Sequence, residues 1–394
     1  MTEPSAPSRL PIRTNEIALF VAILLVIAGA TVIDTNHNYW INPASSARDI
    51  ARHVAPLGIF ALGATVVIIA GGIDLSAGSM IALSGTVCAV LLFTLDPGHL
   101  EGEEPPLMAI TWAIIAALLS GLVVGTLHAW LITSIRLPPF IATLATLVGL
   151  RSFSRALSEF MTEKSELNLP ETFFKWTRES VWWQLGLLIV IAAITYFLLN
   201  WTVLGRHLYA LGGNEQAARL SGIRTENVKW FAYCFGSFTA ALAGILYICN
   251  DGSAKPSNLG QGYELNGIAA AVVGGCSLQG GVGTVVGTLL GTVFLRVVMD
   301  AVAKVIKRGA DVYEGMIVGL VVVVAVVLSQ LQLWADRQRL LAGALGVAAI
   351  PILSLLSGLV TWMTMGKYYG ISLGAVVLVG LIAIKIYEWR DDRA

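Results

Sequence analysis

Charged residues are scarce in this chain: Asp, Glu, Lys and Arg make up 13% of its 394 residues. Ordinary soluble domains are about one quarter charged, so this composition argues against a soluble protein. The formal net charge is zero, which excludes a bulk electrostatic attraction to nucleic acid. Hydrophobic residues account for 56% of the chain, and membrane helices are the natural place for that many.

Cysteine and histidine are also rare, and neither shows a pattern typical of a chemical site. The five histidines have no metal-ligand spacing. The four cysteines are widely spaced in or beside apolar segments, and we expect them to be packing residues; they are Cys88, Cys234, Cys249 and Cys276. The chain has no GxxxxGK[ST] or HExxH motif, so no P-loop or zinc-protease site is predicted. We therefore expect no metal, no catalytic residue and no cofactor bound by this chain.

Long apolar runs are abundant instead. A run of about 20 residues is long enough to cross a bilayer as a helix. Ten runs, one of them a short piece, precede a polar break near residues 336–339, and two more follow it. They cover residues 17–33, 56–70, 76–95, 107–133, 138–157, 182–201, 230–248, 265–273, 282–302, 315–331, 340–360 and 369–386. This pattern predicts an all-α, polytopic membrane helix bundle.

The orientation of the bundle is indicated by its first segment. Arg9 and Arg13 precede the first apolar run and favour a cytoplasmic tail over residues 1–16. Ala28-Gly29-Ala30 is similar to a signal-peptide cleavage site, but the apolar run continues beyond it, so we favour an uncleaved anchor. Lys and Arg in the later loops do not clearly favour one side. An even number of spans places both termini on the same side.

Two glycine pairs interrupt the apolar runs with the same pattern, GGxxLxxG, at residues 71–78 and 274–281. Matching Gly-interrupted segments in two halves are typical of an internal repeat around a transport pathway. Two tight turns with small-residue packing are the alternative. We favour broken helices in two related halves. The residues predicted to form the pathway or its gate are Gly71, Gly72, Asp74, Ser76, Gly78, Gly274, Gly275, Ser277 and Gly281.

Asp74 is the one acid between closely adjoining apolar segments. Intramembrane acids are costly and usually face a cavity, a partner or water, which indicates a gate or interface residue. The alternative, which we favour, is an N-cap for the following span, provided by Asp74 or Ser76.

Two further pairs of charged residues have a spacing of four on predicted helices. Arg151 and Arg155 lie near the outer end of the fifth span, where they could snorkel to the headgroups or meet an acidic partner. Arg296 and Asp300 have the spacing of an ion pair on one helix face.

A long polar break at residues 205–229 carries a small helix of its own. Asn214 is a good N-cap, and Glu215 in the first turn has a favourable position for pairing with Arg219. Gly222 stands where a left-handed residue ends a helix. Such a helix must lie in water or against another protein. We interpret it as the handle by which a soluble partner moves the membrane part, and an ordinary interfacial loop helix is the alternative. The residues predicted to make this contact are Gly213, Asn214, Glu215, Ala217, Ala218, Arg219, Leu220, Ser221 and Gly222.

Several of these segments resemble one protein family. Residues 71–79, 137–144, 205–223 and 274–283 resemble bacterial ABC sugar-importer permeases of the ribose and xylose type, and residues 205–223 are similar to their cytoplasmic coupling loop. The resemblance covers residues 17 to about 333. It implies a permease domain at 17–333 with its coupling loop at 202–229, and an extra two-helix segment at 334–394.

The resemblance also implies a function. The chain is expected to be a permease subunit of an ATP-driven monosaccharide import system in the bacterial inner membrane, with the sugar left open between pentoses and hexoses. The implied partners are a second permease subunit in a homodimer, a separate ATPase subunit that binds ATP-Mg, a periplasmic sugar-binding protein and membrane lipid. No nucleic acid partner is expected, and the chain itself is not expected to be an enzyme.

The main alternative is an ion-coupled secondary transporter of small polar solutes, for which broken helices are equally natural. Such a protein should carry several intramembrane acids or ion ligands, and Asp74 alone is thin support. A membrane enzyme would need clustered nucleophile, acid or base residues, and the sequence shows none.

Overall fold

The computed structural model describes residues 14–34, 38–95, 105–170, 180–305 and 367–391, together with isolated positions between 315 and 358. These ranges are almost entirely helical. Two short strands, β1 (Leu167–Asn168) and β2 (Ser253–Ala254), pair antiparallel. The chain divides into two units, Met1–Ala325 and Val326–Ala394, which are described separately.

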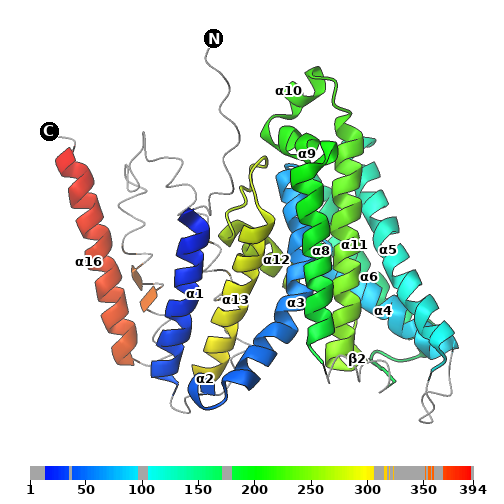
Figure 1. Cartoon of the computed structure of the whole chain (residues 1–394), viewed down its shortest axis with the longest axis horizontal. Coiled ribbons are helices and arrows are strands. Elements are labelled where there is room, and N and C mark those ends of the chain that lie inside the picture. The colour runs from blue at the N-terminus through cyan, green and yellow to red at the C-terminus, as the bar shows by residue number, and fades with distance from the viewer. Residues whose placement is uncertain are drawn as a thin grey trace. The chain divides into compact units, whose positions relative to one another are not determined.

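Eight helices in the described ranges are long and apolar enough to cross a membrane. They are α1 (Thr14–Ile33), α3 (Pro43–Ile69), α4 (Ala77–Leu95), α5 (Leu107–Thr133), α6 (Pro139–Thr162), α8 (Trp182–Trp201), α11 (Thr225–Asp251) and α13 (Val285–Val305). Shorter helices join them: α2 (Asn38–Ile41), α9 (Val203–Gly213), α10 (Glu215–Leu220) and α12 (Tyr263–Val273). The predicted helical membrane bundle is confirmed (Figure 1). The predicted spans at 315–331 and 340–360 lie outside the described residues, apart from isolated positions.

Two spans begin at least five residues earlier than the hydropathy predicted. The second span was expected to begin at Pro56, but α3 begins at Pro43 and contains Pro56 in its interior. The seventh span was expected from Trp230, but α11 begins at Thr225. In both cases the first helical turns are polar. These polar turns are helical because their backbone hydrogen bonds are continuous with those of the apolar part of the helix. A search for apolar residues alone does not detect them.

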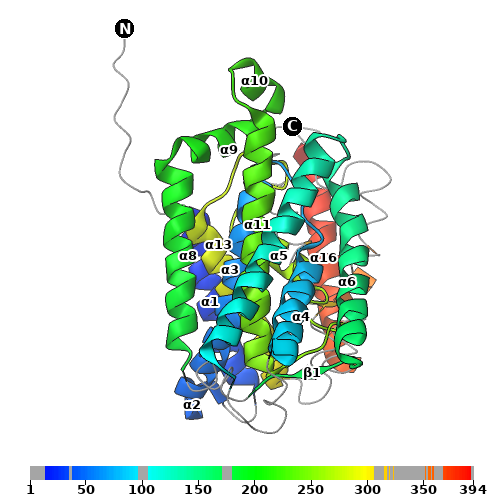
Figure 2. The same ribbon diagram turned by 90° about the vertical axis from the view of Figure 1, so that its right-hand side faces the viewer.

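α11 lies at the centre of the first unit, where it packs against α3, α4 and α5 (Figures 1 and 2). Glycines make these contacts close. A Cβ added at Gly125 of α5 would lie 2.6 Å from the Cα of Cys234, and one at Gly121 would lie 2.7 Å from the Cβ of Ala241. Small residues of this kind let membrane helices approach backbone to backbone. The helix that follows α10 therefore leads directly into the packed centre of the unit.

The second unit contains α16 (Lys367–Asp391), and its close contacts are also made by small residues. A Cβ added at Gly358 would lie 3.0 Å from the carbonyl oxygen of Gly370, and one at Gly374 would lie 3.2 Å from that of Ser354. Small residues spaced by four allow this close helix contact. The predicted last span, 369–386, falls within α16.

Deletion of residues 340–394 is expected to leave the first unit able to insert and fold. Each spanning helix satisfies its own backbone hydrogen bonds, and the chain separates into two units near residue 325. The measurement is membrane yield and monodispersity in detergent. Deletion of residues 1–37, which removes α1 from its packing against α13, is the control expected to fail. A misfolded 340–394 deletion would show that the extra segment belongs to the core.

Candidate functional site

The predicted helix in the polar break is present as α10, with both of its predicted caps. The Oδ1 of Asn214 accepts a hydrogen bond from the Ala217 N–H at 2.9 Å. Gly222 has a φ of +82°, and its N–H donates to the carbonyl oxygen of Arg219, while the Ile223 N–H donates to that of Ala218. This is the Schellman pattern of a helix end. The local sequence alone therefore determines both ends of α10.

A second helix in this break, α9, was not predicted. Thr202 caps it by accepting a hydrogen bond from the Gly205 N–H at 3.0 Å. Leu208 and Leu211 are buried beneath it. This helix could have been predicted from a Thr that can cap it and from leucines at helical spacing after that Thr. The polar residues between the leucines made this pattern hard to recognise. The break is thus two short helices at one end of the bundle, at the top in Figures 1 and 2.

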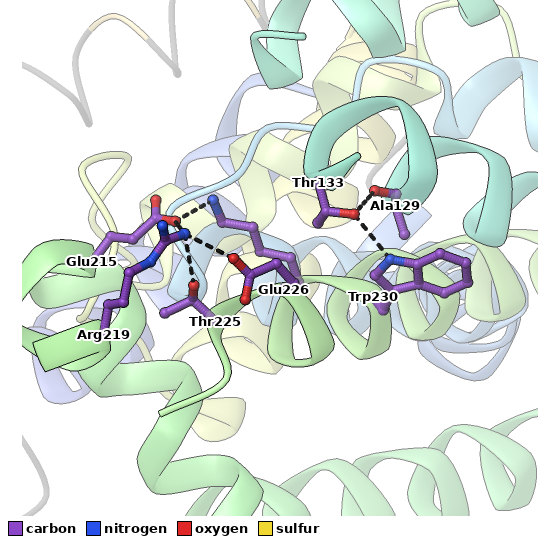
Figure 3. A network of polar contacts seen from close by, with 8 residues as sticks. Ala129, Thr133, Glu215, Arg219, Thr225, Glu226 and Trp230 are labelled. Atoms are coloured by element: carbon purple, nitrogen blue, oxygen red, sulfur yellow. Dashed lines mark hydrogen bonds and ion pairs between the residues drawn. The ribbon is translucent and has the colours of Figure 1, made fainter. Parts of the chain in front are cut away.

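Ion pairs tie α10 to the first turns of α11 (Figure 3). Glu215 pairs with Lys229 at 2.6 Å, and Arg219 pairs with Glu226 at 2.9 Å. The predicted pair of Glu215 and Arg219 is present but longer, at 3.8 Å. Trp230 donates to the Thr133 hydroxyl at 3.0 Å, and this bond joins α11 to α5. The closer ion-pair partners of Glu215 and Arg219 lie on the next helix, so the spacing of charges within one helix could not predict them.

The predicted contact residues of α10 face different ways. Leu220 is 90% exposed, which is unusual for a leucine outside a membrane-facing surface. Asn214, Ala217, Arg219, Ser221 and Gly222 are exposed as well. Ala218 is only 4% exposed and packs toward its own chain. The outer surface available to a partner is therefore centred on Leu220 and Arg219.

The first glycine pair ends α3. The Gly71 N–H donates to Ile68 and the Gly72 N–H to Val67, with Gly71 at a φ of +79°. The chain then runs without helix to Ala77, where α4 begins. Gly72 is needed for space, because an added Cβ would lie 2.5 Å from the Tyr233 hydroxyl.

Asp74 lies in this connection and is 7% exposed. Its Oδ1 accepts from the Ser76 N–H at 2.9 Å and from the Ser76 hydroxyl at 2.6 Å. The carboxylate therefore closes a turn just before α4 and, within the described residues, makes no hydrogen bond to the first-turn amides of α4, which corrects the predicted cap by Asp74. The physical reason is that an Asp side chain readily accepts from the backbone N–H two residues further on, as Asp74 does from Ser76. Ser76, the other predicted cap, directly precedes α4, and its carbonyl oxygen accepts from the Met80 N–H at 2.8 Å.

Two neighbouring helices hold this connection. The His128 Nε2 of α5 lies 3.3 Å from the Ser76 hydroxyl and 2.7 Å from that of Thr146, and the Thr143 hydroxyl of α6 donates to the Ile73 carbonyl at 3.3 Å. Within the described residues, Asp74 Oδ2, His128 Nδ1 and the Tyr233 hydroxyl have no hydrogen-bond partner. No role was predicted for His128 from the sequence, because the five histidines have no metal-ligand spacing. Its position inside the predicted span at 107–133 is the feature of the sequence that could have marked it as a buried polar residue.

The second glycine pair ends α12 with the same hydrogen bonds. The Gly275 N–H donates to Val272 and the Cys276 N–H to Ala271, with Gly275 at a φ of +93°. The structural equivalent of Gly71 is therefore Gly275, whereas the GGxxLxxG pattern paired Gly71 with Gly274. A helix end requires a single left-handed residue, and the other glycine of each pair serves packing. Gly274 provides room for the backbone of Gly287 in α13.

The structure brings most of the predicted glycines to the α10 end of the bundle. The Gly281 N–H donates to the carbonyl oxygen of Ile69 at 2.9 Å, and a Cβ added at Gly281 would lie 2.8 Å from the nitrogen of Gly213. Ser277 accepts in a turn from Gln279 at 3.2 Å. Gly78 lies apart from this group, against Glu264 and Gly260.

A cleft of about 360 Å³, lined by both polar and apolar residues, opens beside these segments. Its lining joins α9 and α10 to the end of α3 and the start of α11. It includes Gly71, Gly72, Gly212, Gly213, Asn214, Glu215, Lys229, Tyr233 and Gln279.

Comparison with known proteins places this arrangement in a family. Residues 46–326 match the model of the permease component of branched-chain amino acid transport systems. The chain belongs to this permease family. It is 34% identical to the ribose import permease of Escherichia coli K12 over 315 residues, which cover 78% of this chain and 91% of the relative. It is 34% identical to the ribose import permease of Bacillus subtilis over 288 residues (72% and 84%), and 30% identical to the galactose/methyl galactoside import permease of E. coli K12 over 284 residues (70% and 83%). No solved structure matches the chain.

This permease is a multi-pass protein of the bacterial inner membrane. The family match ends at residue 326, so the second unit lies beyond it.

Two charged residues of the permease have other partners than predicted. Arg151 does not reach outward but donates to the carbonyl oxygens of Leu259 and Gly260 at 3.0 and 3.2 Å. Asp300 pairs with Lys304 at 2.6 Å and accepts from Tyr39 at 2.5 Å, and no ion pair with Arg296 occurs in the described residues. Lys304 lies four residues after Asp300 in the sequence, just as Arg296 lies four residues before it.

Proposed function

We propose that the permease is the membrane subunit of an ATP-driven importer of a monosaccharide, either a pentose or a hexose of the ribose or xylose kind. The observation that carries the proposal is the position of α9 and α10. α10 presents an exposed surface at one end of the bundle, and the end of α9 that leads into it contacts both Gly-interrupted segments. The ribose and galactose import permeases among the relatives support a sugar as the substrate.

The α10 end faces the cytoplasm in this proposal, with the ATPase subunit docked on α10 and a periplasmic sugar-binding protein docked at the opposite end. Two copies of the permease form the pathway. ATP-Mg is bound and hydrolysed on the ATPase, and closure of the ATPase subunits pushes α10. The push reaches the bundle through α11, which follows α10 after four residues and carries its ion-pair partners.

Specificity for the sugar is assigned to the binding protein. The segments proposed as pathway or gate consist largely of backbone and small residues, including Gly71, Gly72, Gly275 and Gly281. Such a lining offers few side chains to hold a sugar tightly, and it therefore suits release into the cytoplasm.

An ion-coupled secondary transporter is the second candidate, and the buried carboxylate of Asp74 favours it. The same carboxylate accepts two hydrogen bonds from Ser76, which gives it a local role without an ion.

The test is uptake of labelled monosaccharides into proteoliposomes that contain the permease, its ATPase and its binding protein. We expect uptake of one sugar that requires ATP and the binding protein and persists when ionophores collapse ion gradients. Uptake by the permease alone, driven by an ion gradient, would establish the second candidate instead.

A further inference from the structure

Gly212 in the last turn of α9 is in contact with two other backbone segments. A Cβ added there would overlap the carbonyl oxygen of Ile69, at the end of α3, and would lie 2.5 Å from the nitrogen of Gly281, in the loop before α13. Only a residue without a Cβ permits this approach. The backbone of α9 therefore lies directly against both Gly-interrupted segments.

Other contacts join the same three segments. The Tyr209 hydroxyl of α9 donates to the carbonyl oxygen of Gly283 at 2.9 Å. A Cβ added at Gly280, which has a φ of +92°, would lie 2.7 Å from the carbonyl oxygen of Gly212 and 2.8 Å from the Cα of Gly71. We call residues 69–71, 209–213 and 280–283 the glycine junction.

The junction lies next to the exposed helix. Asn214 ends α9 and also caps α10, so only Gly213 separates Gly212 from the residue that caps α10. Contacts between backbones cannot be relieved by a change of side-chain rotamer, as contacts between long side chains can. A displacement of α10 therefore moves the end of α3 and the 280–283 loop together.

We propose that Gly212 is a positioning residue of the transport cycle, which passes the displacement of α10 to both Gly-interrupted segments at once. The proposal rests on the proposed function, in which an ATPase moves α10. It assigns Gly212 a step after docking, since its contacts are within the permease and it does not form the outer surface of α10. Changes at Gly212 should therefore separate ATP hydrolysis from transport.

The test compares Gly212→Ala with Gly186→Ala in the complete reconstituted complex. For Gly212→Ala we expect uptake per ATP hydrolysed to fall by about tenfold or more, the effect of an extra methyl group in a rigid contact. ATPase co-purification and hydrolysis should stay within about twofold of the unmodified complex, because the α10 surface is unchanged. Gly186 is the matched control: it is a helical glycine of α8 outside the glycine junction and the α10 surface, and a Cβ added there has no neighbour within 4 Å among the described residues, so its ratio should not change.

Tyr209→Phe is the milder variant, and it tests the proposal if Gly212→Ala fails to insert. It removes the hydrogen bond to Gly283 and should lower uptake per ATP by about fivefold. The proposal is overturned by an unchanged ratio in an inserted Gly212→Ala or in Tyr209→Phe, by an equal loss in Gly186→Ala, or by a parallel loss of ATPase binding. Absence of ATP-driven uptake in the unmodified complex would overturn the proposed function instead.

Discussion

Arg219→Glu is expected to insert at the normal level but to lose recruitment and stimulation of the ATPase. The change removes the 2.9 Å pair with Glu226 and places a third acid beside Glu215. Exposed pairs of this kind contribute at most about 1 kcal/mol to folding, and both caps of α10 remain. A reversed charge held against a partner surface costs several kcal/mol, so docking should suffer far more than folding.

The internal ion pairs could produce the same loss by a purely structural route, and a charge swap separates the two. The double variant Arg219→Glu, Glu226→Arg restores an internal pair while it keeps the altered α10 surface. Arg219→Lys keeps the charge and should retain most ATPase binding. Co-purification and ATP hydrolysis are the measurements. Full recovery in the double variant would mean that α10 matters for its internal pairs and not as a docking surface.

Asp74→Ala is expected to lower sugar uptake by about tenfold at matched protein level in the membrane. It leaves the Ser76 N–H and hydroxyl without their acceptor, and each buried unpaired donor costs about 1–3 kcal/mol. The disturbance falls on the connection between α3 and α4 and not on a spanning helix, so insertion should be little affected. Uptake should fall because this connection leads from the glycine junction to α4.

Asp74→Asn is the matched control, since it keeps an oxygen that can accept from Ser76. Uptake close to normal with Asn and low with Ala would assign the role to the hydrogen bonds; equal losses would assign it to the charge. Normal uptake in Asp74→Ala, measured at equal protein level, would contradict any role of Asp74 in the transport cycle.

Features set by neighbouring residues were predictable from the sequence. The ends of α10 follow from Asn214 and Gly222, whose caps involve atoms within five residues. The bounds of α5 and α8 matched because their apolar runs are long and uninterrupted, with tryptophans at both ends of α8.

Features set by packing between distant segments were not predictable. Lys229 reaches Glu215 across 14 positions, and His128 meets Ser76 across 52, so no spacing rule applies to either contact. The repeated GGxxLxxG pattern indicated two broken segments but aligned them one residue out of register. In the first pair the helix-ending glycine is the first one, Gly71, whereas in the second pair it is the second one, Gly275. The role of Gly212 depends on two segments that come together only in the folded chain.

The central claim is that α10 is the surface on which the ATPase acts, and site-specific photocrosslinking tests it most directly. A photoreactive residue at Leu220, which is 90% exposed on α10, should form an adduct with the ATPase subunit in the complete complex. The same photoreactive residue at Trp182, which is 80% exposed and is the first residue of α8, should form none, because α8 begins at the end of the bundle opposite α10 (Figure 2). Failure of Leu220 to crosslink in a complex that hydrolyses ATP and imports sugar, or an ATPase adduct at Trp182, would contradict the claim.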